Sequence, residues 1–561
     1  MKKSALPACF AILLCLGIFI FHDYGISWDE NTQRNTGIVF LNHVQKTLHC
    51  EFVKLPANVP ELKDYQDREF GGVFEVFLFS LERMLNLQDY REVYLFRHFL
   101  NFIFFCLGAM ALASIIRKRF ESWYLPLIGF LLFITHPRIF AESFYNSKDM
   151  IVMVFFVFSF YFYLRFVQEG KYRFIIFLAL FSAITFNIRP IGLLIPFLAW
   201  VILGPQLFMH SLPRTNRKKT LISLLILTAS FLFFTWLTNP YLWSDPFGRA
   251  YATISKFLQY DVSHTAGHVL FLGRFIPTNQ LPWYYLPLWI GITTPVVHLF
   301  LFLAGILILV IKLPVRNSPG FTSFNTSMDL FIFGWMLIPV VIAVSFHSTM
   351  YDGWRHFYFL WPAFIYAAIA GAKSLIHYLN RRILPRFWGI LSLIGVLVVF
   401  ETMTVIDMIR SHPYQYCYFN PLAPAPSRNF ELDYWGLSYH DALVYLTHTD
   451  RSDTLRIKVL NLPGYLNAFI LPPADRKRLY FDYSLRENYS ARIESYFPFK
   501  AEPSIMVKQE KPTYYLSNFR DTGSPDEIYN YWHHLSPYSN QVYSIKAEEM
   551  EIMGIYRLPV K

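Results

Sequence analysis

A series of long apolar runs constrains the fold of this chain more than any other feature. The runs recur along the first 410 positions of the 561-residue sequence. Each has roughly 17 to 25 residues, which is long enough to cross the hydrocarbon core of a bilayer. Only 16% of the residues are charged, whereas a soluble domain carries about 25%. The sequence therefore predicts a polytopic α-helical membrane protein with about eleven transmembrane helices. The expected spans are 7–22, 93–116, 123–140, 150–166, 172–187, 190–206, 220–238, 284–311, 328–346, 355–375 and 386–408.

Basic residues form short clusters between these spans. The net charge of +11 is therefore typical of membrane topology, because Lys and Arg favour cytoplasmic loops, and no nucleic-acid partner is expected. With Met1 in the cytoplasm, an odd number of spans places the tail outside. The clusters expected on the Met1 side are Arg117-Lys118-Arg119, Lys171 with Arg173, Arg214 through Lys219, Lys312 with Arg316, and Arg381-Arg382.

The first apolar segment, 7–22, admits two interpretations. Lys2 and Lys3 precede it, as they would in a cleaved signal peptide. However, no small-residue cleavage site follows Phe21. The segment is therefore expected to remain as the first span.

Beyond residue 408 the sequence changes character. Residues 409–561 are polar and rich in Tyr, with short alternating stretches that predict strands and a helix expected at 439–447. The chain is therefore divided into a transmembrane catalytic module, 1–408, and a small soluble extracytoplasmic α/β domain, 409–561. The expected strands are LRIKVLNL, KRLYFDY, TYYLSNF, QVYSIKA and EIMGIYRL.

Two further outer segments are too long to be simple connections. Residues 23–92 contain an amphipathic stretch, ENTQRNTGIVFLNHVQKTL, that can lie along the membrane surface. Residues 239–283 are rich in aromatic side chains, as is common at a membrane interface. Cys50 and Cys417 both fall on the outer side, where they could pair in an oxidising compartment, a point that the sequence leaves open.

Ionisable residues gather at the outer ends of the spans. A secondary transporter or proton pump would place such residues near the bilayer midplane, whereas a boundary between water and an apolar cavity suits chemistry on a lipid headgroup. The residues at this rim are Asp29, Glu30, Arg97, His98, His136, Arg138, Glu142, Lys148, Asp149, Arg189, Arg355 and His356.

Transfer from a lipid phosphate to an alcohol needs a carboxylate to take the acceptor proton and cations to stabilise the leaving phosphate. Asp29-Glu30 fits the first need, with Asp149 as a second acidic site. These acids could instead cap the helices that follow them. Arg189 and the pair Arg355-His356 fit the second need, and lone rim arginines could instead reach lipid headgroups or form ion pairs.

Metal binding has weak support in the sequence. His136 and Glu142 are two ligand types without a third, and a metal site in a protein generally needs at least three. No metal and no cofactor are therefore expected.

Several islands of sequence resemble the membrane-embedded GT-C glycosyltransferases, specifically the family 39 branch of protein O-mannosyltransferases and aminoarabinose transferases. The islands are the acidic pair after the first span, HP…NSKDM ending at residue 149, NIRPIG, MYDGWRHFYFLWP (350–362) and ELDYWGLSYHDAL (431–443). The tail does not look like the sugar-binding β-trefoil of eukaryotic protein mannosyltransferases.

The resemblance implies a GT-C-like fold and a role for each matching residue. Asp29 would be the general base, Glu30 would help to shape the site, and Asp149 would be the second acidic residue of the catalytic site. Arg189 and Lys148 would bind the donor phosphate, and Arg355 and His356 are weaker additions to that set.

The expected function is an inverting transfer of one sugar, a hexose or a pentose, from a polyprenyl-phosphate donor. The acceptor hydroxyl would belong to a lipid, glycan or protein on the extracytoplasmic face. The bacterial inner membrane is the expected location, with the endoplasmic reticulum as the alternative. Two rival functions are a transporter or flippase of an anionic lipid-linked glycan, and a non-catalytic membrane scaffold.

Overall fold

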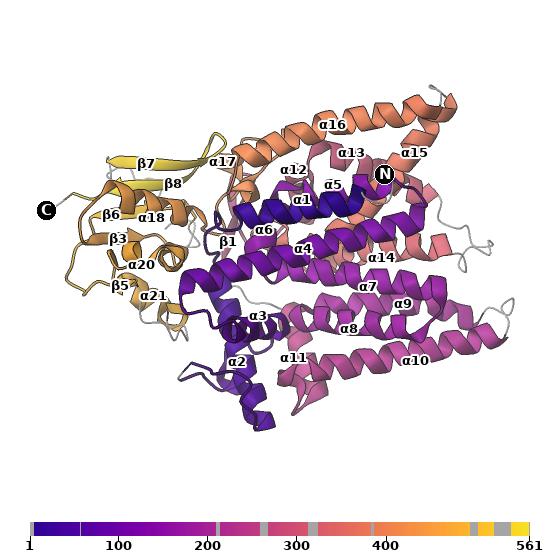
Figure 1. Ribbon diagram of the computed structural model, residues 1–561, viewed down its shortest axis with the longest axis horizontal. Helices are drawn as coiled ribbons and strands as arrows, with labels where there is room; N and C mark the ends of the chain where they lie inside the picture. Colours follow the sequence, from indigo (N-terminus) through magenta and orange to yellow (C-terminus); the bar gives the residue numbers. More distant parts are fainter. Residues whose placement is uncertain are drawn as a thin grey trace.

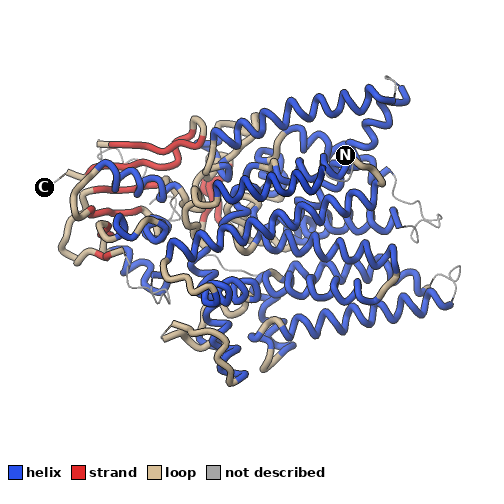
Figure 2. Tube along the Cα trace, viewed as in Figure 1, coloured by secondary structure: helices blue, strands red, loops and turns tan. Residues whose placement is uncertain are grey.

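The computed structural model describes residues 5–56, 58–208, 214–258, 267–311, 324–382, 386–493, 503–520 and 540–559. Long apolar helices run side by side in one bundle, and a mixed β-sheet lies at one end of it (Figures 1 and 2). The amino terminus lies toward the opposite end of the bundle, and the carboxyl terminus lies beside the sheet.

The described residues contain seven helices that are long and apolar enough to cross a membrane. A bent pair of helices forms an eighth candidate, and three shorter apolar helices accompany them. The polytopic helical fold predicted from the sequence is therefore confirmed. The apolar helices are α1 (Ala5–Ile20), α4 (Tyr90–Phe120), α5 (Leu125–Ile134), α6 (Pro137–Tyr145), α7 (Asp149–Glu169), α8 (Tyr172–Ile188), α9 (Leu194–Leu203, preceded by the 3-10 turn η2, Pro190–Leu193), α10 (Arg214–Leu237), α13 (Val296–Ile311), α14 (Phe324–Ser345), α15 (Trp361–Arg382, preceded by η6, Arg355–Leu360) and α16 (Arg386–Arg410).

Two expected spans are interrupted at prolines. The span expected at 123–140 bends by 68° between α5 and α6, where His136 accepts a hydrogen bond from the Ile139 amide and Pro137 begins the new helix. The span expected at 284–311 is divided into α12 (Tyr285–Thr293) and α13. Pro295 separates them, because proline has no amide hydrogen to continue the helical bonding.

The long outer segment folds into helices that run across the bundle. Figure 1 shows α2 (Glu30–Leu48) crossing the direction of α4 and α7 at the end of the bundle nearest the sheet. It packs against α3 (Val73–Met84). A side-chain carbon added at Gly71 would lie 1.8 Å from the Asn187 carbonyl oxygen, so only glycine allows this segment to approach the end of α8 so closely.

The second outer segment contains α11 (Pro246–Leu258) and a hairpin of β1 (His268–Phe271) and β2 (Arg274–Pro277). Among the expected basic clusters, Arg117, Lys118 and Arg119 occupy the last turn of α4, at the end of the bundle away from the sheet. Lys312 and Arg316 lie outside the described residues.

The described residues of the tail form a six-stranded sheet of order β5-β4-β3-β6-β8-β7. β3, β4, β5 and β6 are parallel, and β8 is antiparallel to both β6 and β7. All five stretches expected as strands are strands, and the expected helix is α18 (Ser438–Thr449). The remaining elements are β3 (Leu455–Val459), β4 (Leu479–Phe481), β5 (Ser504–Ile505), β6 (Tyr514–Ser517), β7 (Gln541–Ala547), β8 (Met550–Arg557), α17 (Pro426–Asn429), α19 (Pro463–Leu466), α20 (Pro473–Arg476) and α21 (Ser484–Ile493).

The sheet region is bonded to the loop between α1 and α2. Asn467 accepts a hydrogen bond from the Ile26 amide (2.8 Å) and donates one to the Ile26 carbonyl (2.9 Å). The Trp28 amide donates to the Trp435 carbonyl (3.1 Å). The sequence left open whether Cys50 pairs with Cys417; in the structure both are free thiols, with Cys417 buried.

Candidate active site

A cavity of about 1450 Å³ is lined by residues of the helix bundle, of its outer segments and of the sheet region. One part of its wall is apolar, and several of the side chains there are well exposed, among them Phe197 at 50% and Leu232 at 55%. An exposed apolar groove among membrane helices suits an acyl or isoprenoid chain. The groove is lined by Ile191, Leu194, Phe197, Phe231, Leu232 and Ile342, from η2, α9, α10 and α14.

The other part of the cavity is polar, and two of the predicted cations, Arg189 and Lys148, line the cavity. Arg189 follows the last residue of α8, and Pro190 turns the chain into η2 directly after it. Lys148 stands just before α7, with its ammonium 4.0 Å from the centre of the Phe70 ring. Among the described residues, Lys148 has no hydrogen bond or ion pair through its ammonium group, so this cation is available to an anionic ligand.

Asp29 and Asp149 are brought together by arginines. Arg355 Nη1 donates to Asp29 Oδ2 (2.8 Å) and lies 3.5 Å from Asp149 Oδ2. Arg189 pairs with the other oxygen of Asp149, and Asn146 donates to Asp149 from the preceding turn (3.2 Å). Asp29 lines the cavity with a side chain that is 32% exposed, whereas Asp149 is buried behind it.

These charges influence the ionisation of Asp29 and Lys148, two of the titratable groups that line the cavity. Burial opposes the charge of Asp29, but the nearby guanidinium of Arg355 outweighs it and lowers the pKa of Asp29 below its ordinary value. Burial, reinforced by the charge of Arg189, lowers the pKa of Lys148 to about 8. At neutral pH the site therefore holds a carboxylate beside an ammonium group.

Glu30 is directed away from the cavity. It accepts a hydrogen bond from the Ser27 amide (2.6 Å) and pairs with His98 Nε2 (2.8 Å), and it is 2% exposed. The sequence grouped Glu30 with Asp29 because the two are adjacent, but consecutive residues at the start of a helix point in different directions. Glu30 therefore fixes the turn that presents Asp29.

His356 lies in the cavity wall, with its ring 4.7 Å from that of Tyr351. His136 and Glu142 are buried apart from the cavity: His136 lies near Thr294, and Glu142 accepts hydrogen bonds from Tyr358 and Tyr434 (2.7 Å each). No group of three or more His, Cys, Asp or Glu side chains is arranged to hold a metal ion within the described ranges.

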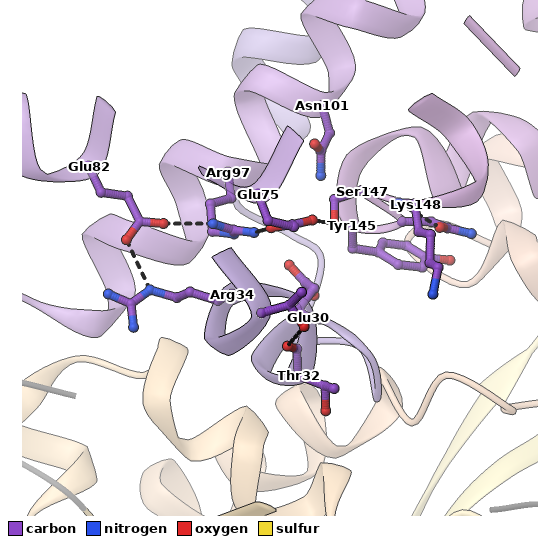
Figure 3. A network of polar contacts seen from close by, with 12 residues as sticks. Glu30, Thr32, Arg34, Glu75, Glu82, Arg97, Asn101, Tyr145, Ser147 and Lys148 are labelled. Atoms are coloured by element: carbon purple, nitrogen blue, oxygen red, sulfur yellow. Dashed lines mark hydrogen bonds and ion pairs between the residues drawn. The ribbon is translucent and has the colours of Figure 1, made fainter. Parts of the chain in front are cut away.

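A buried ionic network supports the turn that carries Lys148 (Figure 3). Arg34 pairs with Glu82 (2.9 Å), Glu82 pairs with Arg97 (2.7 Å), and Arg97 pairs with Glu75. Glu75 also accepts a hydrogen bond from the Ser147 hydroxyl (2.5 Å). The network therefore joins α2, α3 and α4 to the residue directly before Lys148.

Four charged residues that line the cavity were not among the predicted site residues: Asp64, Asp67, Asp352 and Arg520. Asp352, which pairs with Arg355 Nη2 (3.1 Å), stands three residues before it in a turn where Asp352 and Gly353 both have positive φ. Arg520 reaches the cavity from the end of β6. The three-residue spacing of Asp352 and Arg355 could have indicated that Asp352 belongs to the site, whereas nothing local in the sequence connects Arg520 to it.

No family model and no curated protein matches this chain in sequence. Among solved structures, it is similar to the archaeal oligosaccharyltransferase AglB from Archaeoglobus fulgidus, in complex with an inhibitory peptide and a dolichol-phosphate. The TM-score is 0.51 and the identity 11%, over 92% of this chain and 70% of that chain. ArnT from Cupriavidus metallidurans, bound to undecaprenyl phosphate, gives a TM-score of 0.45 and 13% identity over 99% of this chain and 98% of that chain. The likeness to AglB shows that the two chains share a fold.

Proposed function

We propose that this chain is a membrane glycosyltransferase that moves one sugar from a polyprenyl-phosphate donor to an acceptor hydroxyl. The observation that carries the proposal is that an apolar groove and a group of charged side chains line one cavity. Lys148, Arg189 and Asp29 line it together with the groove, and Arg189 directly precedes Pro190 and Ile191. An isoprenoid chain, its phosphate and a proton acceptor would each meet a matching surface.

The donor phosphate would lie against Lys148 and Arg189. A polyprenyl-phosphate sugar carries one negative charge, and the polyprenyl phosphate that leaves carries up to two. Cations at this position therefore stabilise the leaving group more than the bound donor, which is the requirement for lowering the barrier. Arg355 is close enough to share this role, since it already contacts Asp29 and Asp149.

Asp29 would act as the general base. The acceptor oxygen forms a bond to the anomeric carbon while the bond from that carbon to the phosphate oxygen breaks. The electron pair leaves with the phosphate, and the acceptor proton passes to Asp29. A lowered pKa is compatible with this role, because the attacking hydroxyl becomes strongly acidic as its bond to carbon forms. Attack on the face opposite the phosphate inverts the configuration.

The acceptor would approach through the polar part of the cavity. Trp28, Gln33, Asp64 and Asp67 line that part, and such side chains suit hydroxyl groups on a lipid, a glycan or a protein. We place the sheet and this opening on the extracytoplasmic side, because the described basic cluster at the end of α4 lies at the opposite end of the bundle. The bacterial inner membrane is the proposed location.

The test is turnover by the purified protein in lipid nanodiscs. The probes are polyprenyl-phosphate monosaccharides that carry a radiolabelled hexose, pentose or amino sugar, mixed with a lipid and glycan extract of bacterial envelopes. A glycosyltransferase releases polyprenyl phosphate and labels an acceptor. Intact donor that crosses the bilayer of sealed vesicles without turnover would instead indicate a flippase, and neither outcome would be expected of a scaffold.

Asp29→Asn is the decisive variant. Its transfer rate should fall by about 10²- to 10⁴-fold, the usual contribution of a general base, with an unchanged thermal unfolding temperature. Asp23→Asn is the matched control, because Asp23 lies in the same loop but pairs with His412 outside the cavity (2.8 Å). Full activity of Asp29→Asn would contradict the assigned role.

A further inference from the structure

One cationic side chain of the cavity comes from the C-terminal sheet. Arg520 stands three residues after the end of β6, and its side chain is only 9% exposed. The sheet region thus reaches into a site whose other charged members come from the membrane bundle and its outer loops.

Several contacts fix the position of Arg520. Its Nη2 pairs with Asp352 Oδ1 (2.5 Å), and its Nη1 donates to the Tyr434 carbonyl. Its guanidinium lies 5.5 Å from the centre of the Trp28 ring. The Asn461 amide group donates to its backbone carbonyl (3.2 Å). A side chain that is fixed by contacts on several sides is suited to position another group.

Asp352 connects Arg520 to the proposed catalytic cluster. One of its oxygens pairs with Arg520 and the other with Arg355 (3.1 Å). Arg355 in turn donates to Asp29 (2.8 Å). The four side chains form a line of alternating charge from the sheet to the carboxylate that faces the cavity. Asp352 also has a φ of +57°, a conformation that a non-glycine residue keeps only where its surroundings fix it.

We propose that Arg520 is a positioning residue of the active site, through which the C-terminal domain sets the place of Arg355 and hence of Asp29. The inference rests on the proposed function and assigns a role to the C-terminal domain within it. Arg520 holds Asp352, Asp352 holds one side of the Arg355 guanidinium, and the other side remains directed at Asp29.

The consequence of losing Arg520 follows from the charges. Asp352 would keep a single cationic partner, so Arg355 would be drawn toward it and away from Asp29. The charged groups that face Asp29 are Arg355, Lys148, Arg189 and Asp352. Because a more distant Arg355 stabilises the Asp29 carboxylate less, the pKa of Asp29 rises toward its ordinary value. Activity that needs the Asp29 carboxylate would then begin to fall at a higher pH.

The experiment compares Arg520→Ala with Arg456→Ala in the nanodisc assay. Arg456 is a matched control because it lies in the same sheet, on β3, with a side chain that is 44% exposed. Arg520→Ala should lower kcat by about 10- to 100-fold, the cost of a misplaced catalytic group, and should move the acidic limb of the pH–rate profile upward. Binding of undecaprenyl phosphate alone should stay near the wild-type affinity, and Arg456→Ala should behave as wild type.

Two further variants separate positioning from folding. Arg520→Lys keeps the charge and should restore part of kcat. In the double variant Arg520→Ala/Asp352→Asn, the loss of kcat should be smaller than the product of the two single losses, because both substitutions act through the same chain of contacts. Three results would each overturn the inference. They are losses of kcat that multiply in the double variant, a wild-type kcat and pH profile for Arg520→Ala, and an effect of Arg520→Ala confined to undecaprenyl phosphate binding. Absence of transfer by the wild-type protein with every donor would instead reject the proposed function.

Discussion

Two groups of buried charge lie on opposite sides of the Ser147-Lys148-Asp149 turn, and they are built differently. Behind the turn, two arginines and two glutamates alternate, and each of these side chains is at most 5% exposed. In front of it, Lys148 keeps an ammonium without an ion pair among the described residues, and Asp29 is 32% exposed to the cavity.

This difference indicates that the buried network has a structural role, whereas the cluster at the cavity is suited to bind a ligand. A charge-balanced, buried network whose members do not line the cavity is suited to fix the elements it joins, here α2, α3 and α4 against the turn (Figure 3). An open cluster with an available cation can receive an anion. Variants of the two groups should therefore fail in different ways.

The largest effect is expected in the closed network. Arg97→Ala leaves Glu75 and Glu82 buried without their shared partner, and breaking a buried ion pair from one side costs about 3–5 kcal/mol. Thermal unfolding in detergent should show this loss of stability, together with reduced yield from membranes. Arg91→Ala, an exposed arginine on the same helix, should be neutral. A stable Arg97→Ala protein that had lost only donor binding would contradict the distinction between the buried network and the cluster at the cavity.

A smaller effect, of another kind, is expected in the open cluster. Arg189→Ala should weaken binding of undecaprenyl phosphate by about 10- to 100-fold, the equivalent of one charge-assisted hydrogen bond, with little change in unfolding temperature. Asp149 would keep Arg355 and Asn146 as neighbours. Affinity measured by fluorescence quenching of a labelled lipid phosphate is the readout, and Arg173→Ala at the other end of α8 is the control. Unchanged affinity would remove Arg189 from the phosphate site.

The smallest effect is a pH dependence. Since the pKa of Lys148 is lowered to about 8, its ammonium is present below that pH and is lost as the pH rises through it. The phosphate itself titrates near pH 6, so its charge is constant over this range. Affinity for undecaprenyl phosphate should fall by up to about tenfold between pH 7 and pH 9. Lys148→Arg should flatten this dependence, because a guanidinium stays charged, and an equally steep profile in that variant would exclude Lys148 as its origin.

The sequence predicted those parts of the molecule that follow from local patterns. Apolar run length located the helices, alternation located the strands of the tail, and proximity to a span placed Asp29, Asp149 and Arg189 at one end of the bundle. The breaks at Pro137 and Pro295 were missed because hydropathy continues across them.

Other features depend on tertiary packing, and a single sequence carries little information on that. Glu30 turns inward because His98 and the Ser27 amide lie there. Arg520 reaches the site only because the sheet docks against the loop that carries Trp28. The network from Arg34 to Ser147 contains pairs up to 72 positions apart that no local pattern specifies, such as Glu75 with Ser147.

A structure of the protein in nanodiscs with undecaprenyl phosphate added would test the central claim most directly. We expect the phosphate within hydrogen-bonding distance of Lys148 and Arg189, the isoprenoid chain along Phe197 and Leu232, and Asp29 facing the phosphate oxygen that would carry the sugar. A lipid phosphate bound elsewhere, with this groove empty or filled by ordinary phospholipid, would contradict the account.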